Sequence, residues 1–128
     1  MARILLAEDE EALCALCARA LMDDGHDVTT ASDGVDALDR LAGESARFDL
    51  LLTDIRMPMM DGIALALAAA RDYPDLTILL MTGYADQRER AHGLDAIVHD
   101  VIAKPFTVAL LRAAVREALM VKGGSGLR

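Results

Sequence analysis

The sequence contains no tryptophan and few other aromatic residues, with two tyrosines and two phenylalanines among 128 residues. Hydrophobic residues nevertheless make up 54% of the chain, so its core must consist of alanine, aliphatic side chains and methionine. A chain of this length falls in the usual size range of one domain and can bury such a core. We therefore expect one globular domain.

Positive charge is also scarce, because 13 lysines and arginines stand against 21 aspartates and glutamates, for a formal net charge of −8. A protein that binds the nucleic-acid backbone needs a clustered basic face, so we expect no direct DNA binding. The longest apolar run, Ile63 to Ala70, is far shorter than the roughly 18 residues of a membrane span. The apolar stretch at the start of the chain is too short for a signal peptide. We expect a soluble, cytoplasmic protein without membrane contact.

Cysteine is limited to Cys14 and Cys17, which have the C-x-x-C spacing of redox proteins. A redox pair would lie at a strand-to-helix turn with one thiol exposed, whereas these two residues lie inside an apolar helical pattern. No second pair and no nearby histidine would complete a zinc site. We interpret both residues as small buried hydrophobes.

Short strand-like segments alternate with helical patterns along the chain. The segments with strand character are residues 4–7, 28–31, 50–54, 77–81 and 101–103. Residues 4–7 show no polar alternation, as expected of a strand that is covered on both faces. Strands separated by helical crossovers predict an α/β fold, in which helices cover both faces of a doubly wound, five-stranded parallel sheet.

Helical periodicity fills the intervals between these segments. The face of the first helix carries Leu13, Leu16, Cys17, Ala20 and Leu21, at the spacing of an amphipathic helix. Ser32 is placed to cap the second helix. Further helices are expected over about residues 61–71, around 86–96, and from Val108 onward. We assign residues 1–121 to the domain and expect residues 122–128 to be a flexible tail.

Polar residues end the predicted strands. Glu8 and Asp9 follow the first strand, and Asp54 ends the third. Thr82 and Lys104 end the fourth and fifth strands. Ligands of doubly wound sheets bind beyond the carboxyl ends of the strands. The acids, the hydroxyl and the ammonium should therefore meet at one edge of the sheet.

This combination of groups points to phosphoryl transfer. Crowded carboxylates repel one another unless a cation lies among them, and oxygen ligands favour a hard ion such as Mg²⁺, which leaves room for a phosphate. Lys104 and Thr82 would supply a positive charge and a hydrogen-bond donor to a phosphoryl group. Asp54 is the natural nucleophile, because a carboxylate can attack phosphorus to give an acyl phosphate.

Four segments also carry a family resemblance: ILLAEDE (4–10), LLLTDIRMPMMDG (50–62), LLMTGYA (79–85) and AKPF (103–106). With all four in this order, the chain resembles the response-regulator receiver domains of bacterial two-component signalling over about residues 2 to 121. The resemblance implies a flavodoxin-like fold with strand order 2-1-3-4-5. It extends to the single-domain members, which include chemotaxis regulators. The opening residues and residues 90–106 are similar to the cell-cycle adaptors of alphaproteobacteria.

The resemblance also implies roles for individual residues. Asp54 would be the phosphoacceptor, and Asp9 and Asp54 would bind Mg²⁺ directly. Glu8 would bind the ion through water, and the backbone carbonyl of Arg56 would be the further protein ligand. Thr82 resembles the switch hydroxyl. The remaining implied features are the lysine that pairs with the phosphoryl group, at position 104, and a cis bond between that lysine and the following proline.

The resemblance further implies the partners. A histidine kinase or a histidine phosphotransfer protein would donate the phosphoryl group. The surface of the fourth helix, fifth strand and fifth helix would then bind a protein target. A phosphorylation-dependent dimer is left open. The family usually has an aromatic residue three positions before the lysine, where this chain has Val101. The switch would then work through backbone shifts alone, unless Tyr84 or Phe106 replaces the aromatic signal.

Two other functional classes fit the residues less well. A haloacid-dehalogenase-type phosphatase would need a second aspartate two residues after the nucleophile. Arg56 occupies that position and cannot act as a general acid at neutral pH. A nucleotide- or flavin-binding module would need a glycine-rich loop after the first strand, where this chain has acids. We therefore expect a signalling module whose chemistry is limited to its own phosphorylation and dephosphorylation. Arg56 and Tyr84, near the mouth of the site, would shield the acyl phosphate from water.

Overall fold

The computed structural model describes residues 2–43, 47–83, 91 and 93–126, with side chains described as far as Val121. The strands of this part of the chain are β1 (Arg3–Ala7), β2 (Asp27–Ala31), β3 (Leu50–Asp54), β4 (Thr77–Thr82) and β5 (Asp100–Ala103). The helices are α1 (Glu11–Asp23), α2 (Gly34–Gly43), α3 (Gly62–Asp72) and α5 (Val108–Gly126). None of the described helices is long and apolar enough to cross a membrane.

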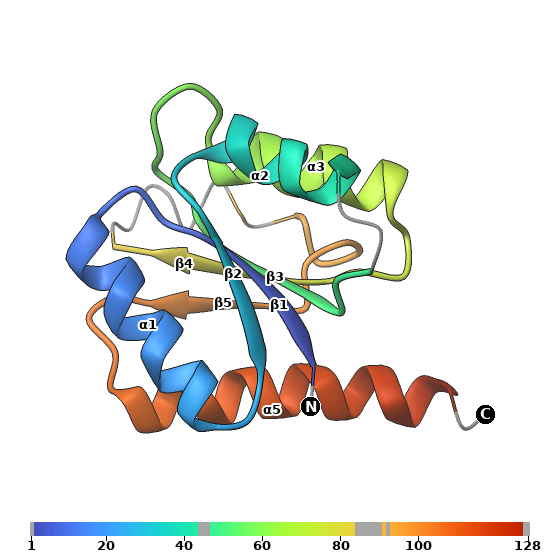
Figure 1. Ribbon diagram of the computed structural model, residues 1–128. Helices are drawn as coiled ribbons and strands as arrows, with labels where there is room; N and C mark the ends of the chain where they lie inside the picture. The colour runs from blue at the N-terminus through green and yellow to red at the C-terminus, as the bar shows by residue number, and fades with distance from the viewer. Residues whose placement is uncertain (1, 44–46, 84–90, 92, 127–128) are drawn as a thin grey trace.

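The strands form one parallel sheet in the order β2-β1-β3-β4-β5 (Figure 1). The predicted fold class and strand order are therefore confirmed. The central strand, β3, pairs with β1 on one side, where Ile4 aligns with Leu50, and with β4 on the other, where Asp54 aligns with Met81. This register brings the carboxyl ends of β1, β3 and β4 to the same edge.

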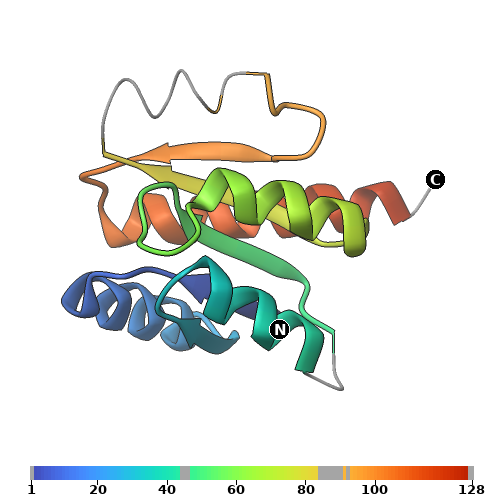
Figure 2. The same ribbon diagram turned by 90° about the horizontal axis from the view of Figure 1, so that it is seen from above.

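Helices cover both faces of the sheet, with α1 and α5 on one face and α2 and α3 on the other (Figures 1 and 2). Successive residues of a strand point to opposite faces, so Leu50 and Leu52 pack in the core beside α1 and α5. Leu51 packs in the second core, beneath α2 and α3. Every residue of β3 is buried, which explains why its sequence shows no polar alternation.

The buried face of α1 differs from the predicted one. Cys17 and Leu21 are buried as expected, but Leu16 is 55% exposed, so its assignment to the core face was wrong. A residue next to Cys17 in sequence is rotated by about 100° around the helix axis, and here this rotation turns Leu16 out of the core. Both cysteines are free. Burial raises the pKa of the Cys17 thiol to about 11, as fits a buried hydrophobic residue rather than a reactive thiolate.

The helix ends also refine the predictions. The side chain of Asp33, rather than that of Ser32, caps α2 by accepting a hydrogen bond from the Asp36 amide at 2.8 Å. The expected fourth helix lies largely outside the described residues, and residues 93–96 are not helical. Gly93 has a φ of 100°, a backbone conformation that favours glycine. The last helix, α5, extends to Gly126, beyond the predicted start of the tail at residue 122.

Candidate functional site

The site lies at the carboxyl edge of the sheet and contains polar groups that are almost fully buried. Glu8, Asp54 and Thr82 are only 2%, 6% and 3% exposed. Acidic residues are rarely buried to this degree unless they have partners. Asp9, the next residue after Glu8, is exposed and gives the cluster an open side toward solvent.

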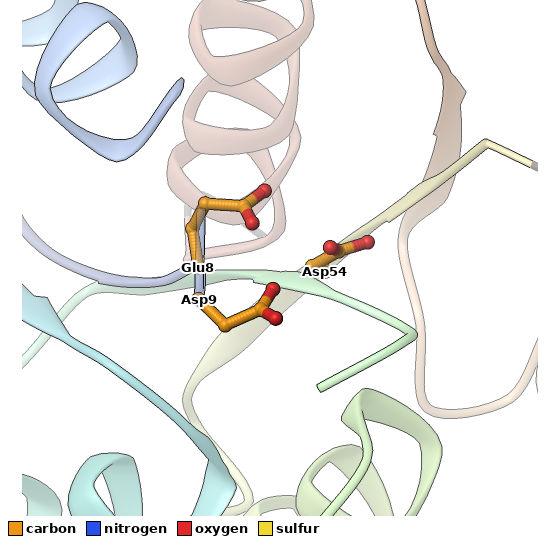
Figure 3. A group of neighbouring side chains, drawn as sticks. All are labelled: Glu8, Asp9 and Asp54. Atoms are coloured by element: carbon orange, nitrogen blue, oxygen red, sulfur yellow. The ribbon is translucent and has the colours of Figure 1, made fainter. Parts of the chain in front are cut away.

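Glu8, Asp9 and Asp54 form a group of three carboxylates (Figure 3). Each contributes one oxygen atom, and these oxygens lie within 4.8 Å of one another. The first two residues directly follow β1, and Asp54 ends the neighbouring strand β3. Asp9 and Asp54, which are 45 positions apart in sequence, thus lie close together because β1 and β3 are paired in register.

Lys104 partly neutralises this group. Its Nζ donates to Glu8 Oε1 at 2.9 Å and to Asp54 Oδ2 at 3.0 Å. The Lys104 amide also donates to the Thr82 carbonyl at 2.7 Å, and the following peptide bond to Pro105 is cis, as predicted. Burial, the largest single effect, lowers the pKa of Lys104, but the hydrogen bonds to Glu8 and Asp54 together with the negative charges of these two residues raise it above its ordinary value.

Glu8 is held from both sides. Its Oε2 accepts a hydrogen bond from the Glu10 amide at 2.9 Å, while Oε1 accepts from Lys104. Burial raises the pKa of the Glu8 carboxyl above its ordinary value of 4.5, although these two hydrogen bonds lower it, and the charge of Asp54 adds to the rise. The negative charge on this cluster is therefore costly, which favours a bound cation.

The backbone around Asp54 is fixed by close packing. The Ile55 amide donates to the Met81 carbonyl at 3.0 Å, and the Gly62 amide donates to the Ile55 carbonyl at 2.7 Å. A Cβ atom on Gly62 would lie 2.0 Å from the Asp54 carbonyl oxygen, so only glycine allows α3 to start this close to β3. Gly62 thereby holds the end of the loop that follows Asp54 against the end of β3.

A cleft of about 620 Å³ opens beside the acids. Its polar end contains Asp9, Asp54 and Arg56, and its apolar side is lined by Leu16 and other residues of α1 and α5, together with Phe106, which precedes α5. The exposed Leu16 therefore belongs to a surface next to the acidic group. Helical periodicity could not have identified this surface, because periodicity does not say which part of an apolar face another element covers.

Val101 and Phe106 are the described residues that bear on the expected switch. Val101 is half-buried and packs against the core beneath α2 and α3, as an ordinary strand residue would. Phe106 is half-buried on the opposite side of the sheet, in the core beside α1 and α5. Tyr84 lies outside the described residues. The role of Val101 thus remains a prediction.

The donor set fits a hard divalent cation. Three carboxylates offer oxygen atoms only, one of them on an exposed residue, and Mg²⁺ prefers one or two carboxylates together with water and phosphate oxygens. Lys104 contributes one positive charge and lies close to two of the three acids. Three carboxylates and one ammonium leave the group with excess negative charge, which a bound cation would neutralise.

Comparison with known proteins agrees with this geometry. A family model described as "Response regulator receiver domain" matches residues 4–116. The chain belongs to the response regulator receiver domain family. Receiver domains are signalling modules of two-component systems rather than classical enzymes, and they bind Mg²⁺ at an acidic pocket.

Relatives and solved structures support the assignment. The response regulator MprA of Mycobacterium avium (strain 104) is 38% identical over 117 residues, which cover 91% of this chain and 50% of that regulator. This receiver domain thus spans about half the length of the curated relatives it matches. A CheY-like receiver domain protein from Methanospirillum hungatei JF-1 has a TM-score of 0.88 at 27% identity, covering 98% of each chain.

A second similar structure is that of a complex. The response regulator TrrA from Thermotoga maritima, in complex with Mg²⁺ and BeF, has a TM-score of 0.82 at 28% identity. The match covers 93% of this chain and 100% of that protein. The fold of this receiver domain is therefore one on which a metal complex of this kind has been observed.

Proposed function

We propose that this receiver domain is the phosphoacceptor module of a two-component phosphorelay, and that Asp54 receives the phosphoryl group. The observation that carries the proposal is the buried Asp54 carboxylate, which ends the central strand with Lys104 Nζ at 3.0 Å and two further acids beside it. A histidine kinase or a histidine phosphotransfer protein is the donor. The expected compartment is the cytoplasm.

The transfer exchanges one bond to phosphorus for another. A carboxylate oxygen of Asp54 attacks the phosphorus of the donor's phosphohistidine and forms a P–O bond while the P–N bond breaks. The electron pair of the broken bond stays on the imidazole nitrogen. No general base is required, because the attacking carboxylate carries no proton that must be removed. Bound Mg²⁺ would neutralise the charge that accumulates between the carboxylates and the phosphoryl oxygens.

The residues around Asp54 bind the metal ion and orient the phosphoryl group. Asp9 and Asp54 would bind the metal directly, Glu8 would bind it through water, and the Arg56 carbonyl would complete the protein ligands. Lys104 exchanges its hydrogen bond to Asp54 for one to a phosphoryl oxygen. Thr82 is buried at the end of β4. Its hydroxyl donates a second hydrogen bond to the phosphoryl group and moves toward it.

The phosphodonor approaches through the cleft. Leu13, Leu16 and Phe106 line its apolar side, next to the carboxylate that must be reached. A partner that presents its phosphohistidine on an apolar surface would bury Leu16, which this chain leaves 55% exposed. Apolar contact would then supply affinity, while the acids and Lys104 fix the phosphoryl group.

The phosphorylated domain passes its signal to a protein target through the surface of the fourth helix, β5 and α5. Within the described part of this surface, Leu110, Met120 and Val121 of α5 are exposed hydrophobic residues. Exposed apolar side chains favour protein contact. A phosphorylation-dependent dimer is an alternative use of the same surface.

Mass spectrometry after incubation with acetyl phosphate tests the proposal. We expect a gain of one phosphoryl group, about 80 Da, in the wild type with Mg²⁺. This gain should be absent without Mg²⁺ and absent in Asp54→Ala. Asp75→Ala, which changes an exposed aspartate away from the cluster, is the matched control and should behave as wild type. Equal phosphorylation of wild type and Asp54→Ala would refute the assignment.

A further inference from the structure

The first residue of α2 is in close contact with the loop that follows Asp54. A Cβ atom on Gly34 would lie 2.5 Å from the Met60 carbonyl oxygen and 2.8 Å from the Met60 Cβ. Real Cβ atoms essentially never approach other atoms below 3.0 Å. The backbone of Gly34 is outside the left-handed region, so the position requires glycine for space rather than for its conformation. Figure 2 shows the start of α2 beside the loop that precedes α3.

The α2 side of this contact is firmly held. The Asp36 amide donates to the Asp33 side chain at 2.8 Å, and the Ser32 amide donates to the Asp36 carboxylate at 3.0 Å. Ala37, one turn into the helix, is fully buried. A side chain added at Gly34 would therefore displace the loop more easily than the helix.

The loop side of the contact is exposed to solvent in part. Pro58 and Met59 are exposed, and Met59 has a φ of 71°. The base of the loop cannot yield, because Gly62 lies against the Asp54 carbonyl and bonds Ile55. The Met60 amide donates to the Pro58 carbonyl at 2.8 Å, so a displacement of Met60 also moves Pro58. From there it passes along the backbone of Met57, whose side chain is buried in the core, to Arg56.

We propose that Gly34 is a positioning residue for Mg²⁺ binding. Because Gly34 has no Cβ, Met60 can pack directly against its backbone. The position of Met60 in turn determines, through residues 56–59, the position of the Arg56 carbonyl. The inference rests on the proposed function, which assigns that carbonyl to the metal. Residues that orient a metal ligand without touching the metal typically change its affinity by roughly 10–100-fold when they are replaced.

The experiment compares two glycines of the same helix. Gly34→Ala introduces the clash, whereas Gly43→Ala, at the other end of α2, adds a Cβ with nothing within 4 Å. Each ¹⁵N-labelled protein is titrated with MgCl₂, and amide shifts give the Mg²⁺ dissociation constant. We expect Gly34→Ala to bind Mg²⁺ about tenfold more weakly than wild type, with the largest shift differences at residues 55–57. Gly43→Ala should bind as wild type does.

The outcomes separate a positioning role from a merely structural one. A lower melting temperature with unchanged Mg²⁺ affinity in Gly34→Ala would overturn the inference while leaving the proposed function intact. Absence of Mg²⁺ binding by the wild type would overturn both. Should Gly34→Ala fail to fold, Met60→Gly decides, because it removes both side-chain atoms of Met60 that face Gly34, Cβ and Cγ. Weaker Mg²⁺ binding by Met60→Gly would support the inference, and wild-type affinity would overturn it.

Discussion

Replacing Lys104 with methionine would remove a cation that lies between two buried carboxylates. The Glu8 side chain is fully buried, and that of Asp54 is 8% exposed. Two unit charges at the 4.8 Å limit of this cluster repel by about 3 kcal/mol at an effective dielectric constant of about 20. Removing one partner from a buried ion pair costs roughly 3–5 kcal/mol. Because the Lys104 side chain is 22% exposed, we expect a loss of about 3 kcal/mol in unfolding free energy at pH 8.

This loss should depend on pH through Glu8. Burial already raises the pKa of that carboxyl above 4.5, and without Lys104 it should rise further. Well below pH 4.5 the carboxyl is protonated in both the folded and the unfolded chain, so it contributes no penalty. As the pH rises above 4.5, the unfolded chain ionises first, and stability falls until the folded carboxyl ionises as well. The cost of Lys104→Met should therefore be larger at pH 8 than at pH 5.

Urea unfolding followed by far-UV circular dichroism at pH 5 and pH 8 measures this cost. Arg40→Met is the matched control, because Arg40 and Asp36 form an exposed ion pair at 3.6 Å that is worth less than about 1 kcal/mol. Adding Glu8→Gln to Lys104→Met should recover most of the loss. A loss no larger than that of Arg40→Met, or one that is equal at both pH values, would refute the reasoning.

Three further predictions concern packing and the acyl phosphate. Gly62→Ala should lower the unfolding free energy by about 3 kcal/mol, because its Cβ would lie 2.0 Å from the Asp54 carbonyl oxygen; a loss below 1 kcal/mol in urea unfolding would contradict this packing. Leu16→Ala should cost less than about 1 kcal/mol, whereas Leu21→Ala should cost roughly 2–5 kcal/mol, and equal shifts in thermal unfolding would contradict the exposed position of Leu16. Arg56→Ala should shorten the acyl-phosphate lifetime, because this exposed side chain lines the cleft, where it would obstruct the attacking water; an unchanged decay rate by mass spectrometry would argue against that role.

The agreement between sequence and structure is closest where one segment carries its own signal. Leu50, Leu51 and Leu52 form a continuous apolar run, which predicts a strand that is buried on both faces, and every residue of this strand is buried. The position of Asp54 at the end of that strand then follows from chain order alone. Leu16 is predicted to face the core by helical periodicity but is exposed in the structure. Its exposure depends on where α1 packs against the sheet and α5, which a local pattern does not give. The cap of α2 differs because Ser32 and Asp33 are both good capping residues, and backbone geometry selects between them.

The sequence alone determined the α/β class, the succession of elements and the residues at the carboxyl ends of the strands. These features depend on local periodicity and on the general rule that parallel strands end at a common edge. Only the tertiary structure decided that Lys104 bonds Glu8 as well as Asp54, that Leu16 borders an apolar cleft, and that Gly34 touches Met60. Each of these contacts joins segments distant in sequence, so it depends on how the helices and loops pack over the sheet, which no local pattern encodes.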